Sequence, residues 1–244
     1  MESTALSPDA GTPLVIVTGA SSGIGQGIAE RLARRGEFRL LLAGRDANRL
    51  DAVTVRCREL GVPEVNSYCG DFSEMNTVLD FARYCKTHAS IRALVNSAGL
   101  GKFAPLEQLA SGDWEQIMHI NVTALFLLCR ELAPNLSAYP GTATIVNISS
   151  DADSVGFPEA VAYCTSKSAV LGMSRALRLE LRQKGIRVCT ISPGRVDTCF
   201  NGKKPGMRPG ALLADEVAEV IEFAVCCSSN IELQDLRFDS MSRF

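Results

Sequence analysis

Segments with the pattern of a strand alternate with segments with the pattern of a helix along almost the whole chain. The first strand-like run, PLVIVTG (13–19), is rich in β-branched residues and ends at a glycine, and a helix-like run, GIGQGIAERLARRG (23–36), follows it. Repeated alternation of this kind builds a parallel sheet with helices on both faces. The sequence therefore predicts an α/β fold with a doubly wound parallel sheet.

The alternation continues to the end of the chain without a linker. Further strands are predicted at 38–44, 65–71, 92–99, 142–149, 186–194 and near 231–238, and further helices at about 46–60, 73–88, 111–135, 161–184 and 214–227. One α/β domain of this length is common. We therefore predict a single domain over residues 14–244, preceded by a flexible N-terminus at residues 1–13.

Composition and charge favour an ordinary soluble protein. A chain of 244 residues with 46% hydrophobic content can bury a substantial core. The formal net charge of -2 offers no basic footprint for nucleic acid and no polybasic face for a membrane. Residues 1–13 lack the pattern of a signal peptide, and no apolar run approaches the roughly 20 residues of a membrane helix. We expect a cytoplasmic protein without nucleic-acid or membrane partners.

The cysteines and histidines do not form a metal-binding pattern. The nine cysteines show no C-x-x-C spacing, and the two histidines, His88 and His119, are isolated in the sequence. Reduced cytosolic thiols therefore fit better than disulfides or a zinc site. No metal site is predicted.

A glycine cluster, TGASSGIG (18–25), separates the first predicted strand from the first predicted helix. Spaced glycines alone are a weak signal, because turns use glycine in every class of protein. The position of Gly19, Gly23 and Gly25 strengthens it, since backbone amides at a helix N-terminus can there meet a pyrophosphate without intervening side chains. The cluster therefore predicts a dinucleotide site.

Tyr163 and Lys167 lie four residues apart in the segment VAYCTSKSAV. Residues at this spacing share one face of a helix, so one ammonium can act on one phenol. A neighbouring cation favours the phenolate and brings proton exchange nearer to neutral pH. A general acid needs this property when hydride adds to a carbonyl. The pair indicates a nicotinamide-dependent reductase.

Several motifs together resemble the short-chain dehydrogenase/reductase family of the single-domain type. TGASSGIG (18–25) resembles the family's TGxxxGxG loop, NSAG (96–99) its NNAG segment and YCTSK (163–167) its YxxxK motif, in the family's order, over about residues 14–198. The resemblance implies a Rossmann-type sheet with helices on both faces. It also implies an oxidoreductase that transfers hydride between NADP(H) and a carbonyl or alcohol substrate.

The resemblance assigns four catalytic residues. It implies that Tyr163 donates the proton to the carbonyl oxygen, while Lys167 lowers the pKa of Tyr163 and holds the ribose. The family's serine stands 13 residues before the tyrosine, which selects Ser150 over Ser149 for orienting the oxygen. Asn121, in HINVTA, would hold a water that relays protons. Taken alone, Ser150 and Asn121 fit capping or backbone hydrogen bonding better than catalysis, and Tyr163 and Lys167 reverse this preference.

Cofactor contacts follow from the same resemblance. Asp71 would contact the adenine, and the segment SPGRVDT (192–198) would lie beside the nicotinamide. The predicted cofactor-binding residues are Gly19, Ser21, Ser22, Gly23, Ile24, Gly25, Arg45, Asp71, Asn96, Ala98, Gly99, Tyr163, Lys167, Pro193, Gly194, Val196 and Thr198.

Gly44 and Arg45, at the end of the second predicted strand, favour NADPH over NADH. Enzymes that use the unphosphorylated cofactor place an acidic residue there, whereas a nearby arginine accommodates the 2′-phosphate. The alternative is a surface arginine that merely follows a strand. Many family members that use NADP place a second cation where this chain has Ser22.

Two positions depart from the family's pattern. Ser97 replaces the second asparagine of NNAG, and Asp153 stands where the family has a small residue. Asp153 could face the substrate pocket and select an amine, amide or polyhydroxyl group, or it could face solvent. We prefer solvent exposure.

The sequence leaves the substrate open. Leu100, Phe103, Phe157, Cys199 and Phe200 could form a partly apolar wall or belong to the core, and the polar segment at 199–213 is predicted to be a mobile lid. The C-terminal IELQDLRF lacks the glycine pair common in bacterial acyl-carrier reductases. Substrates of the 3-oxoacyl, pteridine and hydroxy-acid classes all remain possible.

We expect a homodimer or homotetramer built through the helices at 111–135 and 161–184. The segment ALFLLC (124–129) has no polar face, so its helix should be covered on more than one side. A non-catalytic dinucleotide-binding sensor or scaffold on the same fold is the alternative function, because fold does not determine function. The intact Tyr163 and Lys167 favour the enzyme.

Overall fold

The computed structural model describes residues 11–242, so the predicted flexible N-terminus lies outside the described residues except for positions 11–13. The central element is a seven-stranded parallel sheet with the strand order β3-β2-β1-β4-β5-β6-β9. Its strands are β1 (Leu14–Thr18), β2 (Arg39–Gly44), β3 (Val65–Cys69), β4 (Ile91–Asn96), β5 (Ala143–Ile148), β6 (Ile186–Pro193) and β9 (Asp235–Phe238). The predicted doubly wound parallel sheet is confirmed.

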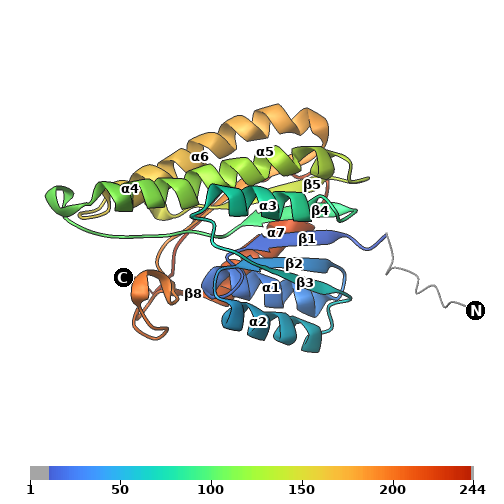
Figure 1. Cartoon of the computed structure of the whole chain (residues 1–244), viewed down its shortest axis with the longest axis horizontal. Coiled ribbons are helices and arrows are strands. Elements are labelled where there is room, and N and C mark those ends of the chain that lie inside the picture. Colours follow the sequence, from blue (N-terminus) through green and yellow to red (C-terminus); the bar gives the residue numbers. More distant parts are fainter. Residues whose placement is uncertain (1–10, 243–244) are drawn as a thin grey trace, which may run out of the picture.

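Helices cover both faces of this sheet (Figure 1). The helices are α1 (Gly23–Arg35), α2 (Ala47–Glu59), α3 (Met75–Cys85), α4 (Ser111–Met118), α5 (Ala124–Ser137), α6 (Val161–Leu181) and α7 (Ala214–Cys226). Helices α1, α2 and α7 pack on one face, with Leu32 and Ile221 in one apolar cluster. Helices α3, α5 and α6 pack on the other, with Phe81 and Val170 in a second cluster.

The central strands are buried along their whole length because both faces are covered. All five residues of β1 and all six of β2 and β5 are buried, as expected for parallel strands between two helix layers. Strand β3 lies at one edge of the sheet, and after the buried Val65 its residues alternate between half-buried and exposed. The sequence pattern therefore follows from each strand's place in the sheet.

The helix predicted at 111–135 is divided in the structure. Helix α4 ends at Met118, a π-helical turn covers His119–Thr123, and α5 continues from Ala124. A π-helical turn inside a longer helix often marks a functional site. Asn121 lies in this turn.

The run Ser111–Ser137 is long and apolar enough to cross a membrane by length and composition alone, which corrects the expectation that no apolar run approaches that length. Half of its most apolar window is buried inside the protein. Residues Leu128 and Leu132 of this run pack in the core cluster of α3 and α6. Packing against the sheet is therefore a sufficient reason for its apolar character.

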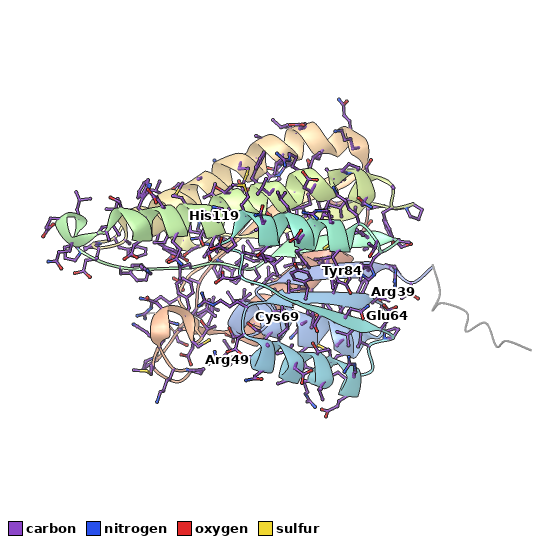
Figure 2. All side chains as sticks on the ribbon, in the orientation of Figure 1. Arg39, Arg49, Glu64, Cys69, Tyr84 and His119 are labelled. Carbon is purple, nitrogen blue, oxygen red and sulfur yellow. The ribbon has the colours of Figure 1, made fainter. Side chains whose placement is uncertain are left out.

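The carboxyl ends of the strands meet along one edge of the sheet. Figure 2 shows Arg39 and Glu64, near the amino ends of β2 and β3, on the opposite side of the molecule from Arg49, which lies in the first turn of α2. On the carboxyl side, two short strands, β7 (Val196–Asp197) and β8 (Leu212–Leu213), pair in parallel and enclose the predicted lid segment. The predicted lid segment therefore lies at the edge where the glycine cluster also lies.

Candidate active site

A cleft of about 1220 Å³ opens at the carboxyl ends of the strands. In open parallel sheets, ligands bind outside these ends. The predicted cofactor-binding and catalytic residues that line it are Gly19, Ser21, Ser22, Gly23, Ile24, Gly25, Arg45, Asp71, Ala98, Gly99, Ser150, Tyr163, Lys167, Pro193, Gly194, Val196 and Thr198. Asn96 and Asn121 are not among the lining residues.

The glycine loop between β1 and α1 has no room for side chains at two positions. Gly19 has a φ of +66°, and a Cβ there would lie 2.8 Å from the backbone of Ala98. A Cβ on Gly25 would collide with the carbonyl oxygen of Gly19. Glycine is therefore required for the close passage of these backbone segments, which lets the loop's amides approach a ligand directly.

The N-terminus of α1 has the features of an anion site. Ser22 is the N-cap, but its side chain makes no capping hydrogen bond, and the first turn contains no acidic residue. The first amides of a helix lack intrahelical partners and carry a partial positive charge. The residues present therefore fit the pyrophosphate of a dinucleotide cofactor.

Arg45 follows β2 directly and is exposed at the cleft, next to two charged residues that the sequence reasoning overlooked. Asp46 caps α2 by accepting a hydrogen bond from the Arg49 amide at 3.0 Å. Its carboxylate also lies 3.2 Å from Arg49 Nε. The capping and the ion pair offset the negative charge of Asp46, so this end of the cleft keeps a cationic side chain available for a phosphate.

Tyr163 lies in the first turn of α6 and is buried. Burial raises the pKa of Tyr163 to about 12, although a hydrogen bond with Ser150 acts in the opposite direction and lowers this pKa. Lys167 Nζ lies 5.7 Å from the centre of the Tyr163 ring. The expected downward shift of the tyrosine pKa is therefore not present in the protein alone, because desolvation penalises the phenolate.

Lys167 lies one helical turn after Tyr163, on the same face of α6, as predicted. Its side chain is buried, and Nζ donates a hydrogen bond to the carbonyl oxygen of Ile148 at 2.8 Å. Burial lowers the pKa of Lys167 to about 8, while the charge of Asp153 raises it. The ammonium is thus held at the end of β5, beside the catalytic serine predicted from the sequence.

Ser150 lies two residues after the end of β5 and is the N-cap of the short 3-10 turn Asp151–Asp153. Its Oγ accepts a hydrogen bond from the Ala152 amide at 3.3 Å and donates one to Asp151 Oδ1 at 2.9 Å. The neighbouring Ser149 instead donates to the carbonyl oxygen of Lys167 at 3.2 Å. Of the two serines, Ser150 is the one that bonds with Tyr163.

Asn121 lies beneath the cleft. Its Oδ1 accepts from the Leu100 amide at 2.7 Å, and its Nδ2 donates to the Leu100 carbonyl at 2.9 Å and to Ser166 Oγ at 2.9 Å. A Cβ on Gly99 would lie 3.5 Å from Asn121 Oδ1 and 3.8 Å from Lys167 Nζ. Asn121 therefore fastens the loop after β4 close to Lys167, and its predicted role in holding a water stays a prediction.

Asn96, at the end of β4, turns into the protein. Its Nδ2 donates to Asn147 Oδ1 at 2.9 Å, and Asn147 in turn donates to Ser174 at 2.9 Å. This buried chain ties β4 and β5 to α6. The amide of Asn96 thus supports the sheet beneath the cleft, where the sequence reasoning had expected a cofactor contact.

Asp153 does not face solvent, which corrects the preferred expectation. Its side chain is fully buried, Oδ1 accepts from Arg237 at 2.6 Å, and Oδ2 accepts from Ser192 Oγ at 2.5 Å. A buried carboxylate needs such partners to offset the cost of desolvation. Asp153 therefore links the turn after Ser150 to the end of β6 and to β9.

The predicted apolar wall is present at the other end of the cleft. Leu100, Phe103, Phe157, Cys199 and Phe200 all line it. The ring centre of Tyr163 lies 5.6 Å from that of Phe103 and 5.7 Å from that of Phe200. Aromatic side chains therefore surround the phenol on two sides.

Arg208 holds the lid segment together, and no local pattern in the sequence marks it. Its guanidinium donates to the carbonyl oxygens of Val196 at 2.7 Å, Thr198 at 3.0 Å and Phe200 at 2.9 Å. Most of the segment around it is exposed, whereas Arg208 is half-buried. Arg208 thus holds the backbone of Val196 and Thr198, two predicted cofactor-binding residues, and the backbone of Phe200, whose ring lies against Tyr163.

The family model for short chain dehydrogenases matches residues 13–208 of the chain. Among curated proteins, a 3beta-hydroxysteroid dehydrogenase from Mediterraneibacter gnavus is 35% identical over 187 residues, which cover 76% of this chain and 66% of that enzyme. The matched region contains the glycine cluster, Ser150, Tyr163 and Lys167.

Solved structures resemble the whole described fold. An alcohol dehydrogenase from the archaeon Thermococcus sibiricus, complexed with 5-hydroxy-NADP, has a TM-score of 0.88 and 27% identity, covering 95% of this chain and 98% of that one. A short-chain dehydrogenase from Sphingobium yanoikuyae, in complex with NADPH, has a TM-score of 0.81 and 32% identity, covering 92% and 87%.

Proposed function

This chain belongs to the short-chain dehydrogenase family of oxidoreductases, and we propose that it is an NADPH-dependent carbonyl reductase with Tyr163 as its general acid. The observation that carries the proposal is the convergence of Ser150, Tyr163 and Lys167 at a cleft that also contains the glycine loop. Two similar solved structures hold NADPH or 5-hydroxy-NADP, which supports NADP as the cofactor.

Bound NADPH would supply a hydride to the carbonyl carbon of the substrate. Tyr163 would donate its phenolic proton to the carbonyl oxygen, so the carbonyl becomes an alcohol. With a pKa of about 12, the phenol keeps its proton at neutral pH and has it available to give. Lys167 would then stabilise the phenolate that remains, because its ammonium lies 5.7 Å from the ring centre.

The remaining residues have binding and orienting roles in this proposal. Gly19 and Gly25 would let the backbone approach the pyrophosphate, and Arg45 would bind the 2′-phosphate by charge-assisted hydrogen bonds. Ser150 would hydrogen-bond to the substrate oxygen beside the phenol of Tyr163. The buried ammonium of Lys167 would bind the ribose of the cofactor.

The test is turnover of a panel of ketones and aldehydes by the purified protein with NADPH. Tyr163→Phe should lower turnover by roughly 10²- to 10⁴-fold, the effect of a lost general acid, while the Kd for NADPH stays nearly unchanged. Tyr84→Phe, on α3 and outside the cleft, is the matched control. Tight NADPH binding without turnover of any carbonyl would favour a cofactor sensor, and near-normal turnover by folded Tyr163→Phe would refute the assigned mechanism.

A further inference from the structure

Asp151 lies where it can compete with a substrate for the proton of Ser150, a role that rests on the proposed function. The residue begins the turn after Ser150 and lines the cleft. Ser150 Oγ donates to Asp151 Oδ1 at 2.9 Å. A hydroxyl has only one hydrogen to donate. While this bond is made, Ser150 cannot also donate to the carbonyl oxygen of a substrate.

The other contacts of Ser150 leave its oxygen in place. The Ala152 amide donates to Oγ at 3.3 Å, and the oxygen also bonds with Tyr163. Substrate binding therefore has to redirect the hydrogen of Ser150 without moving the residue. A substrate that donates its own hydrogen bond to the Asp151 carboxylate would replace Ser150 there and release its hydrogen towards the carbonyl oxygen.

The carboxylate of Asp151 can accept such a donor. It has about four acceptor positions, and hydrogen bonds to an ionised carboxylate are roughly twice as strong as neutral ones. A hydroxyl or ammonium group on the carbon next to the carbonyl has the required reach, because Asp151 and Tyr163 both bond with the same serine. A substrate carboxylate at this position would be repelled by the charge of Asp151.

The opposite side of the cleft is apolar. Phe103 and Phe200 flank the ring of Tyr163, and the ring centre of Phe157 lies 6.2 Å from that of Phe103. Of the cations near this end, Lys102 is paired with Asp113 and Arg208 donates to backbone carbonyls, whereas Lys203 lines the cleft with an exposed side chain. A flat, uncharged substituent therefore fits between these rings.

We propose that Asp151 selects carbonyl compounds with a hydroxyl or ammonium group beside the carbonyl and an aromatic or apolar substituent on its other side. A suitable probe is 2-hydroxyacetophenone. Its reduction transfers a hydride from NADPH to the carbonyl carbon and a proton from Tyr163 to the oxygen, and it gives 1-phenylethane-1,2-diol. Asp151 gains and loses no proton in this step.

The test compares three aryl carbonyl compounds that differ beside the carbonyl: 2-hydroxyacetophenone, acetophenone and phenylglyoxylate. Values of kcat/KM are measured for the unmodified protein, Asp151→Asn and Asp151→Ala. Glu180→Gln, an exposed acid of α6 outside the cleft, controls for the change in net charge. Calorimetry with 1-phenylethane-1,2-diol and 1-phenylethanol, in the presence of NADP, measures binding without turnover.

The unmodified protein should prefer the hydroxyketone over acetophenone by at least roughly 10-fold, the value of one charge-assisted hydrogen bond. In both Asp151 variants, the ratio of kcat/KM for the hydroxyketone to that for acetophenone should fall close to one. The kcat/KM for phenylglyoxylate relative to acetophenone should rise, and Glu180→Gln should change neither ratio. The affinity difference between the diol and the mono-alcohol should disappear in the same variants.

A preference for the hydroxyketone that survives Asp151→Ala would overturn the assignment. An equal loss of kcat/KM with all three compounds would also overturn it, because Asp151 would then only support Ser150 structurally. If the unmodified protein reduced other carbonyl compounds but showed no preference for the hydroxyketone, the inference alone would fail. If it reduced no carbonyl compound at all, the proposed function would fail with it.

Discussion

The ring of Phe200 lies against the ring of Tyr163, with 5.7 Å between their centres. Phe200 belongs to the lid segment, and a Cβ on Gly101 would lie 2.6 Å from its ring. The predicted lid segment therefore contacts the phenol ring of Tyr163 through one aromatic side chain, which packs against the loop after β4.

We expect Phe200→Ala to raise KM for aryl ketones by roughly 2- to 10-fold, because one aromatic contact contributes about 0.5–1.5 kcal/mol beyond its buried area. The Kd for NADPH should stay within about twofold, which a fluorescence titration can measure. Phe223→Ala, an exposed phenylalanine on α7, is the control. An unchanged KM would mean that Phe200 leaves the substrate site when substrate binds.

Lys167 should make stability depend on pH in a defined window. Burial lowers its pKa to about 8, whereas the unfolded chain titrates near 10.5. The buried ammonium therefore costs stability at and below pH 8. This cost, on the order of 3 kcal/mol, disappears as pH rises from 8 to 10.5, because only the unfolded state still binds the proton there.

The matched variant for this prediction is Lys167→Met. The difference in the free energy of unfolding between Lys167→Met and the unmodified protein should be largest near pH 7 and should shrink between pH 8 and 10.5. Denaturant titrations at several pH values measure it, and the subtraction removes the contribution of the titrating cysteines. A difference that is constant over this range would contradict the assignment of a depressed pKa to Lys167.

The pair of Asp153 and Arg237 should stabilise the active-site turn. Among the described residues, Arg237→Met would leave the fully buried carboxylate of Asp153 with Ser192 as its one side-chain donor, and loss of a hydrogen bond to a charged group costs roughly 1.5–3 kcal/mol. Arg237→Met combined with Asp153→Asn should be less destabilising than the sum of the two single changes. Strict additivity in denaturant unfolding would show that the two residues do not interact.

A self-association surface on α5 and α6 stays a prediction, but the structure changes which residues support it. Most of the segment 124–129 is buried within the chain, so its apolar character is already explained. The exposed large apolar residues of the two helices are instead Phe126 on α5 and Val161 and Leu179 on α6, and Leu179 is 75% exposed. We expect sedimentation to show a dimer or tetramer at micromolar concentration, and Leu179→Glu to weaken it, whereas Phe223→Glu on α7 does not.

The sequence was sufficient for the seven-stranded sheet and the helices that cover it, because these elements have local signals. Apolar runs between turn residues predicted the strands, and α6 was predicted at 161–184, where the structure has a helix to Leu181 and a 3-10 turn to Lys184. The glycine cluster lies at the expected junction because only glycine fits at Gly19 and Gly25. The π-helical turn at His119–Thr123 was missed, since the apolar pattern continues through it.

The parts of the site that sequence reasoning missed depend on distant partners. Asp153 is buried because Arg237 reaches it from β9, 84 residues later in the chain. Arg208 bonds to backbone carbonyls, which no side-chain motif records. The sequence reasoning considered only Asp153 as an acidic selector for the substrate and preferred solvent exposure for it. Asp151 is the acid of that turn that lines the cleft.

Arg45 allows a quantitative prediction of the preference for NADPH over NADH. The residue is exposed at the cleft, next to the ion pair of Asp46 and Arg49. A charge-assisted hydrogen bond is worth roughly 1.5–3 kcal/mol, so Arg45→Ala should weaken NADPH binding by roughly 10- to 150-fold while the affinity for NADH hardly changes. Arg56→Ala, an exposed arginine of α2 outside the cleft, serves as the control.

A carboxylate introduced near the ribose that carries the 2′-phosphate in NADPH should favour NADH. The side effects on the glycine loop depend on which residue is replaced. A Cβ on Gly44 would lie 3.0 Å from the Ser21 side chain, so Gly44→Asp would displace the glycine loop as well as add a charge. Arg45→Asp adds the charge at an exposed position and should reverse the preference towards NADH by repelling the 2′-phosphate. If titration shows that the unmodified protein binds NADH as tightly as NADPH, Arg45 is an ordinary surface residue and the cofactor assignment is wrong.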